Sequence, residues 1–253
     1  MVSIDLNCDM GEGVADSIES GDGKIMSLVT SANIACGFHA SNPLLMEKTV
    51  QLAKQHGVAV GAHPSYSDHH AFGRRDMDIH PDELRADLIY QVGALSAICR
   101  SVGVTLRHVK VHGALYNRAA IDIETACTVA AAIRDIAPEA CMVCLAGSRM
   151  SEAARALGIP YIEEAFADRG YRADGTLVSR SREGAVLRDP VRVAGRLVGM
   201  IRSGMVEAAD GSMFPLAFQT VCVHGDTPGG IAMIREIRRR LAEEGIRVAP
   251  FDS

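Results

Sequence analysis

The sequence predicts an α/β fold, namely a TIM-like (β/α) barrel variant with seven parallel strands, formed by residues 1–253 as one domain. Three observations favour it. Seven short runs of β-forming residues recur along the chain, segments with helical periodicity separate most of them, and polar side chains gather where the strands end. Strands that alternate with helices are typical of a parallel sheet, because a helix normally makes the crossover between parallel strands.

The seven expected strands are short apolar or alternating runs bounded by turn residues. They occupy Ser3 to Cys8, Ala32 to Cys36, Val58 to Ala62, Arg107 to Val111, Ala140 to Leu145, Tyr161 to Phe166 and Gln219 to Val223. With right-handed crossovers, such an order leaves two architectures, a doubly wound open sheet and a closed barrel.

The expected helices begin and end with local signals. Proline marks the first helical turn, where a backbone N–H would have no acceptor within the helix. Glycine marks the end of the helix, where it readily adopts the left-handed backbone conformation that terminates it. This pattern brackets four helical segments: Leu44 to His56, closed by Gly57; Pro81 to Gly103; Pro190 to Gly204; and Pro228 to Gly245.

The positions of polar residues favour the barrel over the open sheet. In a barrel, the loops that leave the C-terminal strand ends converge on one mouth, whereas an open sheet gathers ligands only at its switch point. Charged, amide and imidazole side chains occur at or just after these ends, namely Asp5, Asn7, Asp9, His39, His63, Lys110, His112, Glu163, Glu164, Asp168, His224 and Asp226.

Two expected connections, Pro64 to Ile79 and Asp168 to Arg188, are much longer than the usual ~2 to 6 residues of α/β loops. The second carries five arginines, namely Arg169, Arg172, Arg180, Arg182 and Arg188. Two interpretations stay open: lids that bind an anionic group, or solvated excursions of the chain.

The composition excludes several classes of partner. With 26 basic and 31 acidic residues the net charge is −5, and no polybasic run is present, so we expect no nucleic-acid partner. The sequence lacks an apolar stretch of about 20 residues and a signal-peptide pattern, so we expect no membrane partner and a cytoplasmic location. The seven cysteines suit reduced core thiols, and Cys141 and Cys144 should point to opposite faces of one strand.

Six segments carry a resemblance to a known family. They are Asp5-Leu-Asn-Cys-Asp-Met-Gly-Glu-Gly13, Ala32-Asn-Ile-Ala-Cys-Gly-Phe-His39, Gly61-Ala-His-Pro-Ser-Tyr66, Phe72-Gly-Arg-Arg75, Val109-Lys-Val-His-Gly-Ala-Leu-Tyr-Asn117 and Cys222-Val-His-Gly-Asp226. In this order, over nearly the whole chain, they resemble the LamB/YcsF family. The resemblance implies a cytoplasmic barrel that works with two partner subunits, B and C, to open 5-oxo-L-proline to L-glutamate while ATP is hydrolysed. ATP is then expected at, or shared with, those partners.

The sequence departs from the family pattern at two places. Ser41 and Asn42 stand where the family usually has a Gly-Asp pair, which removes a carboxylate but keeps a good helix N-cap in Asn42. Val111 replaces the proline of a Lys-Pro-His motif and restores a backbone N–H beside His112.

The polar residues at the expected mouth suit the opening of a cyclic amide. An amide is a poor electrophile, so the reaction needs an activated carbonyl oxygen, which ATP can supply by phosphorylating that oxygen. It also needs a nucleophilic water and an acid for the departing nitrogen. The expected catalytic residues are Asp9, His63, Lys110, His112 and His224. The residues expected to contact substrate are Asn7, Glu12, Asn33, His39, Arg74, Arg75, Asn117 and Asp226.

Two other interpretations remain open. Asp9, His63 and His112 form a set suited to Zn²⁺ or a similar divalent ion, with an open position for water. This predicts a stand-alone metal-dependent amidase, similar to barrel-type carbohydrate deacetylases, although the Lys110 ammonium would compete with the ion. The third interpretation is a non-catalytic subunit that binds the lactam or serves as a scaffold.

Overall fold

The computed structural model describes residues 2–13, 21–223 and 229–251 of the chain. Seven parallel strands pair in sequence order, and β1 also pairs with the last of them, which closes a barrel. The strands are β1 (Ser3–Met10), β2 (Ser31–Ala35), β3 (Ala59–His63), β4 (Leu106–Val109), β5 (Cys141–Leu145), β6 (Tyr161–Phe166) and β9 (Thr220–Cys222). The predicted seven-stranded barrel is therefore confirmed, and the open sheet is excluded.

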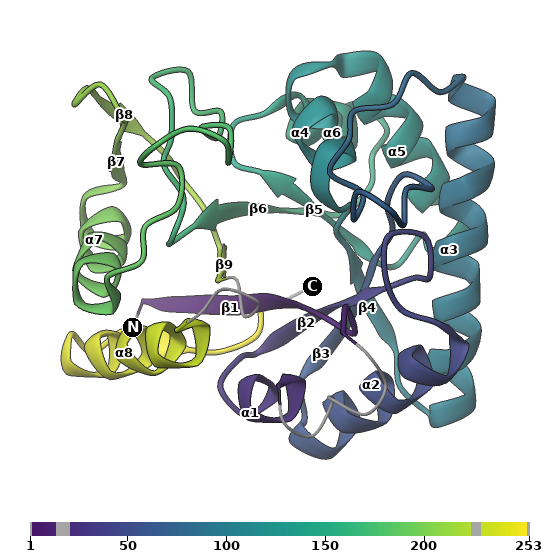
Figure 1. Ribbon diagram of the computed structural model, residues 1–253, viewed down its shortest axis with the longest axis horizontal. Coiled ribbons are helices and arrows are strands. Elements are labelled where there is room, and N and C mark those ends of the chain that lie inside the picture. The colour runs from purple at the N-terminus through teal and green to yellow at the C-terminus, as the bar shows by residue number, and fades with distance from the viewer. Residues whose placement is uncertain (1, 14–20, 224–228, 252–253) are drawn as a thin grey trace.

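Helices surround the strands on the outside, as Figure 1 shows. They are α1 (Asp22–Met26), α2 (Pro43–His56), α3 (Pro81–Val102), α4 (Gly113–Ile121), α5 (Ile123–Ile136), α6 (Arg149–Ala156), α7 (Pro190–Ser203) and α8 (Gly230–Glu243). Three helices, α2, α3 and α7, have proline in the first turn and end at a glycine with positive φ, as predicted. The expected start of the last helix at Pro228 lies outside the described residues, and α8 begins at Gly230.

Three short strands have no counterpart in the sequence prediction. β7 (Met205–Glu207) and β8 (Met213–Pro215) form an antiparallel hairpin, and β10 (Arg247–Val248) pairs with the start of β1. Each has only two or three residues, which is too short for an alternation of polar and apolar side chains to be recognised.

One strand boundary differs from the prediction in a way that affects the site. The expected strand ran from Arg107 to Val111, but β4 ends at Val109. The chain nevertheless continues beside β3, because the backbone N–H groups of Lys110 and His112 donate to the carbonyl oxygens of Ala62 (2.9 Å) and Pro64 (2.8 Å). Both side chains therefore still reach the barrel mouth.

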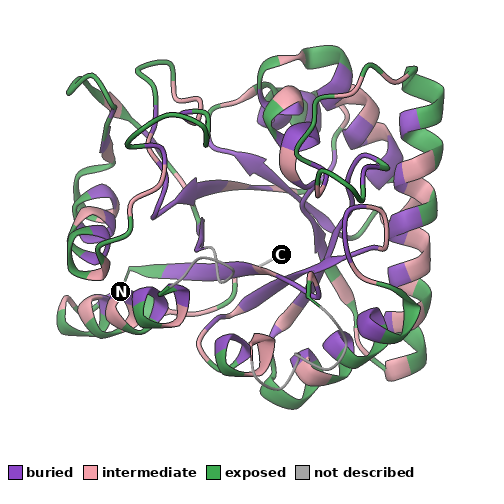
Figure 2. Cartoon of the chain, in the orientation of Figure 1, coloured by how far each residue is buried: buried purple, intermediate pink, exposed green. Residues whose placement is uncertain are grey.

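The apolar core lies mainly between the strands and the helices. Figure 2 shows the seven barrel strands buried over most of their length, while the helices expose their outer faces. Cys141 packs with Val143 and Ile162, whereas Cys144 belongs to the main core cluster, so the two thiols do face opposite sides. All seven cysteines are free thiols in the described structure. Within the described residues, no helix is both long enough and apolar enough to span a membrane.

The centre of the barrel is polar and hydrogen-bonded. We call Asp5, Asn7, Thr30, Ser31, Asn33, His108 and Thr220 the interior network. The Asp5 carboxylate accepts hydrogen bonds from the hydroxyls of Thr30 (2.7 Å), Ser31 (2.7 Å) and Thr220. Further along the barrel axis, the amide of Asn33 donates to Asn7 Oδ1 (2.8 Å) and accepts from His108 Nε2 (2.7 Å). Most polar atoms of this layer are thus hydrogen-bonded to one another, although His108 Nδ1 has no partner among the described residues, and the layer supports the mouth above it.

Candidate active site at the barrel mouth

A cavity of about 500 Å³ opens at the C-terminal ends of the strands. Seven of the residues predicted from the sequence line it, namely Asp9, Glu12, His63, Arg74, Lys110, His112 and Asn117. Asn7, Asn33 and His39 are buried and contact these residues from behind. Arg75 points away, with its side chain 65% exposed and paired with Asp68. His224 and Asp226 lie outside the described residues.

Lys110 forms the charged centre of the cavity wall. Its ammonium lies 2.8 Å from Glu164 Oε1 and 3.2 Å from Asp9 Oδ1, and it donates to Asn7 Oδ1 at 3.2 Å. Burial alone would lower the pKa of this lysine, but the carboxylates of Asp9 and Glu164 hold it well above its ordinary value. Lys110 is therefore a fixed positive charge at neutral pH and cannot act as a base there.

Glu164 was not among the predicted site residues, although it is fully buried beside the cavity. It accepts hydrogen bonds from Asn7 Nδ2 (2.9 Å) and from the hydroxyl of Tyr116 (2.7 Å). Adjacent strand residues point to opposite faces, so of the pair Glu163 and Glu164 only one can enter the barrel. The sequence gives no sign of which one does.

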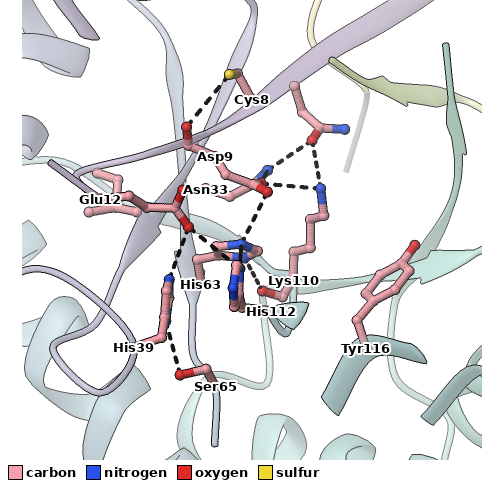
Figure 3. Close-up of polar contacts among 12 residues, drawn as sticks. Cys8, Asp9, Glu12, Asn33, His39, His63, Ser65, Lys110, His112 and Tyr116 are labelled. Atoms are coloured by element: carbon pink, nitrogen blue, oxygen red, sulfur yellow. Dashed lines mark hydrogen bonds and ion pairs between the residues drawn. The ribbon is translucent and has the colours of Figure 1, made fainter. Parts of the chain in front are cut away.

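A second group at the mouth consists of Glu12, His39, His63 and His112, which we call the histidine cluster (Figure 3). One ligand atom from each residue lies within 4.8 Å of all the others. Glu12 Oε1 is 3.0 Å from His39 Nε2 and 3.5 Å from His112 Nδ1, and the latter is 3.0 Å from His63 Nε2. The rings of His39 and His112 stack with centroids 3.9 Å apart, and His63 stands nearly perpendicular to both.

The elements that carry the histidine cluster are held by local structure. Gly11 has a φ of 70°, and its N–H donates to Asp22 Oδ2 (2.8 Å), which turns the chain after β1 and directs Glu12 to the cavity. His39 follows β2, His63 is the last residue of β3, and His112 directly precedes α4. Four separate segments therefore supply one side chain each.

Burial alters the protonation of these histidines. It lowers the pKa of His39 to about 2, with a further contribution from His63. Burial also lowers the pKa of His112 far below its ordinary value, so both rings are neutral at neutral pH. For His63, burial acts in the same direction, but the carboxylate of Asp9, 3.3 Å from His63 Nε2, outweighs it and raises the pKa.

The loop from 64 to 79 packs against the histidine cluster. Phe72 has a φ of 56°, an uncommon conformation for a bulky residue, and its ring meets His39 and His112 edge to face. Gly73 follows with a φ of 63°, where a Cβ atom would come within 3.0 Å of both His39 and His112. Phe72 and Gly73 thus pack against the site, while Ser67, residues 69–71, residues 74–76 and Asp78 of the same loop are exposed.

Arginines of the loop from 168 to 188 hydrogen-bond within the loop or line the cavity. Arg169 is buried and donates to the carbonyl oxygens of Val178 (2.7 Å) and Ala185 (3.1 Å), so it holds the loop together. Arg172 and Arg180 line the cavity, as Arg169 also does, together with Lys110 and Arg74. An anionic group in the cavity would therefore meet several cations.

Comparisons with known proteins agree with the motifs. A sequence profile of the LamB/YcsF family matches residues 4–253. The chain is 51% identical over 245 residues to the 5-oxoprolinase A subunit of Symbiobacterium thermophilum, which covers 97% of this chain and 94% of that protein. It is 47% identical over 251 residues to one of the numbered 5-oxoprolinase A subunits of Pseudomonas syringae pv. tomato, with 99% and 98% covered.

A solved structure has the same fold. The crystal structure of the lactam utilization protein from Thermus thermophilus superposes with a TM-score of 0.92 at 42% identity, covering 99% of this chain and 100% of that one. With this agreement in fold and the match over nearly the whole sequence, the chain belongs to the LamB/YcsF family.

Proposed function

We propose that this chain is the A subunit of a multi-subunit, ATP-dependent 5-oxoprolinase, and that 5-oxo-L-proline is opened to L-glutamate in its barrel mouth. Relatives named as the A subunit of 5-oxoprolinase, 46 to 51% identical over nearly the full length, support the activity. The observation that carries the site assignment is the buried Lys110 ammonium between Asp9 and Glu164 at the cavity wall.

The reaction adds water across an amide bond. The water oxygen bonds to the carbonyl carbon, the bond from that carbon to the ring nitrogen breaks, and the nitrogen takes up a proton. ATP, bound at or shared with the B and C subunits, activates the carbonyl by transferring its γ-phosphoryl group to the carbonyl oxygen, which releases ADP. After the ring has opened, a second water molecule releases that phosphoryl group as inorganic phosphate. The chain itself must then hold the lactam, accept a proton from the water and stabilise negative charge on oxygen.

Asp9 is suited to accept the proton. Its carboxylate lines the cavity, with Oδ1 held by Lys110 and by Asn33 Nδ2 (2.9 Å). The other oxygen, Oδ2, faces His63 at 3.3 Å. Lys110 supplies the fixed positive charge toward the developing oxyanion, while Arg74 and Asn117 are placed on the cavity wall to bind the substrate carboxylate.

Reconstitution tests this proposal. The chain is mixed with the B and C subunits, and glutamate formation is measured with and without ATP. We expect ATP-dependent activity above that of B and C alone, and a loss of about 100-fold or more in kcat for Asp9→Asn. Asp135→Asn, the same change at an exposed carboxylate paired with Arg85, is the matched control and should retain full activity. No gain over B and C alone would refute the proposal.

A stand-alone metal-dependent amidase is a second candidate, favoured by the histidine cluster. It predicts lactam or acetamide hydrolysis by this chain alone, without ATP, and inhibition by chelators. A preparation that is active only with partners and ATP excludes it. Full activity of Asp9→Asn and His112→Ala in the reconstituted enzyme would instead favour the non-catalytic scaffold.

A further inference from the structure

The hydrogen bonds around the histidine cluster direct one nitrogen of each ring toward a common point. Each ring nitrogen that points away from the cluster has an acceptor. His63 Nδ1 lies 2.6 Å from the carbonyl oxygen of Lys110, and His112 Nε2 lies 2.9 Å from that of Phe72. A carbonyl oxygen only accepts, so each of these nitrogens carries a proton and donates it.

His39 follows the same rule through a hydroxyl. Its Nδ1 lies 2.9 Å from Ser65 Oγ, and that hydroxyl donates its own proton to the carbonyl oxygen of Tyr66 at 2.8 Å. Ser65 Oγ is then left with lone pairs to accept the proton of His39 Nδ1. All three histidines therefore use their outward nitrogen as the donor.

The inward nitrogens consequently present lone pairs to one another. His63 Nε2 and His112 Nδ1 face each other across 3.0 Å, and His39 Nε2 faces the Glu12 carboxylate across 3.0 Å. A proton on His63 Nε2, which lies 3.3 Å from Asp9 Oδ2, is the alternative to a metal ion at this centre. Acceptors this close repel unless a positive charge lies among them. This electron-rich centre is buried, since the three histidines are at most 5% exposed.

We infer that Glu12, His39, His63 and His112 bind one divalent transition-metal ion of the Zn²⁺ type, through three imidazole nitrogens and one carboxylate oxygen. In a tetrahedral site with bonds of about 2.0 to 2.1 Å, neighbouring ligand atoms are about 3.3 to 3.4 Å apart. Three of the six separations among the four ligand atoms are 3.0, 3.0 and 3.5 Å, close to that value, and all six are within 4.8 Å. The outward hydrogen bonds are also those that orient histidine ligands in metal sites.

The donor set selects the kind of ion. Imidazole nitrogen suits zinc, cobalt, nickel and iron, whereas magnesium and calcium require oxygen ligands. Glu12, His63 and His112 line the cavity, so a water molecule or a substrate oxygen would approach the ion from this open side as a fifth ligand, in addition to the four protein ligands. Asp9 Oδ2, 3.3 Å from His63 Nε2, stands beside that open side.

This ligand set differs from the Asp9, His63 and His112 set expected from the sequence. Asp9 is already bound by Lys110 and Asn33, which makes Glu12 and His39 the better partners for the two other histidines. The ammonium of Lys110 does not compete for the ion, because its charge is directed to Asp9 and Glu164.

Metal analysis of the purified chain tests the inference without any lactam, so its outcome is independent of the proposed activity. The chain is stripped with a chelator, given Zn²⁺ or Co²⁺, dialysed and analysed by mass spectrometry for metal. We expect about one ion per chain, a visible ligand-field absorption with Co²⁺, and a higher melting temperature with metal than without it.

Variants then identify the ligands. Glu12→Gln and His112→Asn should lower the affinity at least about 100-fold, and Ser65→Ala, which removes the acceptor behind His39, about 10-fold. Ser65→Thr should restore binding because it restores the hydroxyl. His56→Ala, at an exposed histidine that ends α2, is the matched control and should bind metal like the wild type.

Two results would overturn the inference. One is a wild-type chain that binds Zn²⁺ no more tightly than Glu12→Gln, with circular dichroism showing that both are folded. The other is metal binding that none of the cluster variants alters. Either result would mean that a proton on His63, and not a metal ion, separates the lone pairs.

Discussion

The interior network and the histidine cluster occupy adjacent layers of one barrel, and both are built from buried polar residues. In the interior network, the Asp5 carboxylate accepts hydrogen bonds from three hydroxyl groups, and the amide of Asn33 donates to Asn7 Oδ1. In the histidine cluster, three ring nitrogens and a carboxylate point at one another instead. The hydrogen bonds of the interior network stabilise the fold, whereas ring nitrogens and a carboxylate that converge on one point are typical of a metal site.

His108 and His63 illustrate the difference between the layers. His108 belongs to the interior network, where burial lowers its pKa to about 3 and its Nε2 donates to Asn33. His63 has the same degree of burial, but its Nε2 faces two acceptors, Asp9 and His112. Burial alone therefore does not distinguish a structural histidine from a ligand, and the direction of each nitrogen does.

The largest effect is expected at Lys110, which contacts both layers. In Lys110→Met, Asp9 and Glu164 lose their shared cation, and we expect the free energy of unfolding to fall by about 3 to 5 kcal/mol, measured with urea at pH 7. In the wild type, the raised folded-state pKa makes this stabilisation complete below the ordinary lysine pKa, and it is lost only as the pH rises through the folded value. Lys54→Met, at an exposed lysine, should change stability by less than about 0.5 kcal/mol. Equal stability of the two variants would contradict a shared role of Lys110.

Gly61→Ala tests the packing of the interior network. A Cβ atom at this position would lie 2.1 Å from the ring of His108, which cannot move away because it is fully buried. We expect the free energy of unfolding to fall by about 3 kcal/mol, measured by thermal or urea denaturation. Gly195→Ala, in α7 and with open space around it, should instead raise stability by about 0.5 to 1 kcal/mol. An unchanged stability of Gly61→Ala would show that the barrel centre is looser than described.

Thr220→Val separates the two layers most directly. The hydroxyl of Thr220 donates to Asp5 and accepts from Asn7 Nδ2 at 2.8 Å, and valine removes it at nearly constant volume. We expect the free energy of unfolding in urea to fall by about 1 to 3 kcal/mol. The metal content of the folded chain should stay unchanged. Glu12→Gln should show the reverse, with reduced metal content and little change in the stability of the metal-free form. If Thr220→Val lost metal as well, the two layers would have to be treated as one unit.

The smallest effect is expected at Ser41, which lies outside both layers. Ser41 has a φ of 80°, in the region that favours glycine. Ser41→Gly should therefore stabilise the chain by about 1 kcal/mol, visible as a higher melting temperature. Phe72→Gly, which also removes a positive φ from a bulky residue, should lower metal affinity instead because the Phe72 ring packs on His39 and His112. A destabilised Ser41→Gly would mean that the serine side chain compensates for its backbone conformation.

The residues that are recognisable in the sequence are those whose signal is local. Asn42 was expected as an N-cap, and its side chain accepts from the backbone N–H of Leu45 at 3.0 Å. Asp9, His63 and Lys110 were expected at the mouth because each follows or ends a strand, and all three line the cavity. The choice of Glu164 over Glu163 depends on strand orientation, and the outward direction of Arg75 depends on its pairing with Asp68. Neither has a signature in the surrounding sequence.

The sequence by itself determined the succession of strands and helices and the presence of polar residues at strand ends, because hydrophobic period, proline and glycine act over a few neighbouring residues. Only the tertiary structure decided that Glu12 and His39 join His63 and His112. That grouping depends on the closure of the barrel and on the acceptors behind each ring, such as Ser65 and the carbonyl of Phe72, which set the direction of every lone pair. The orientation of a side chain in three dimensions is a property of these distant contacts, and no spacing along the chain encodes it.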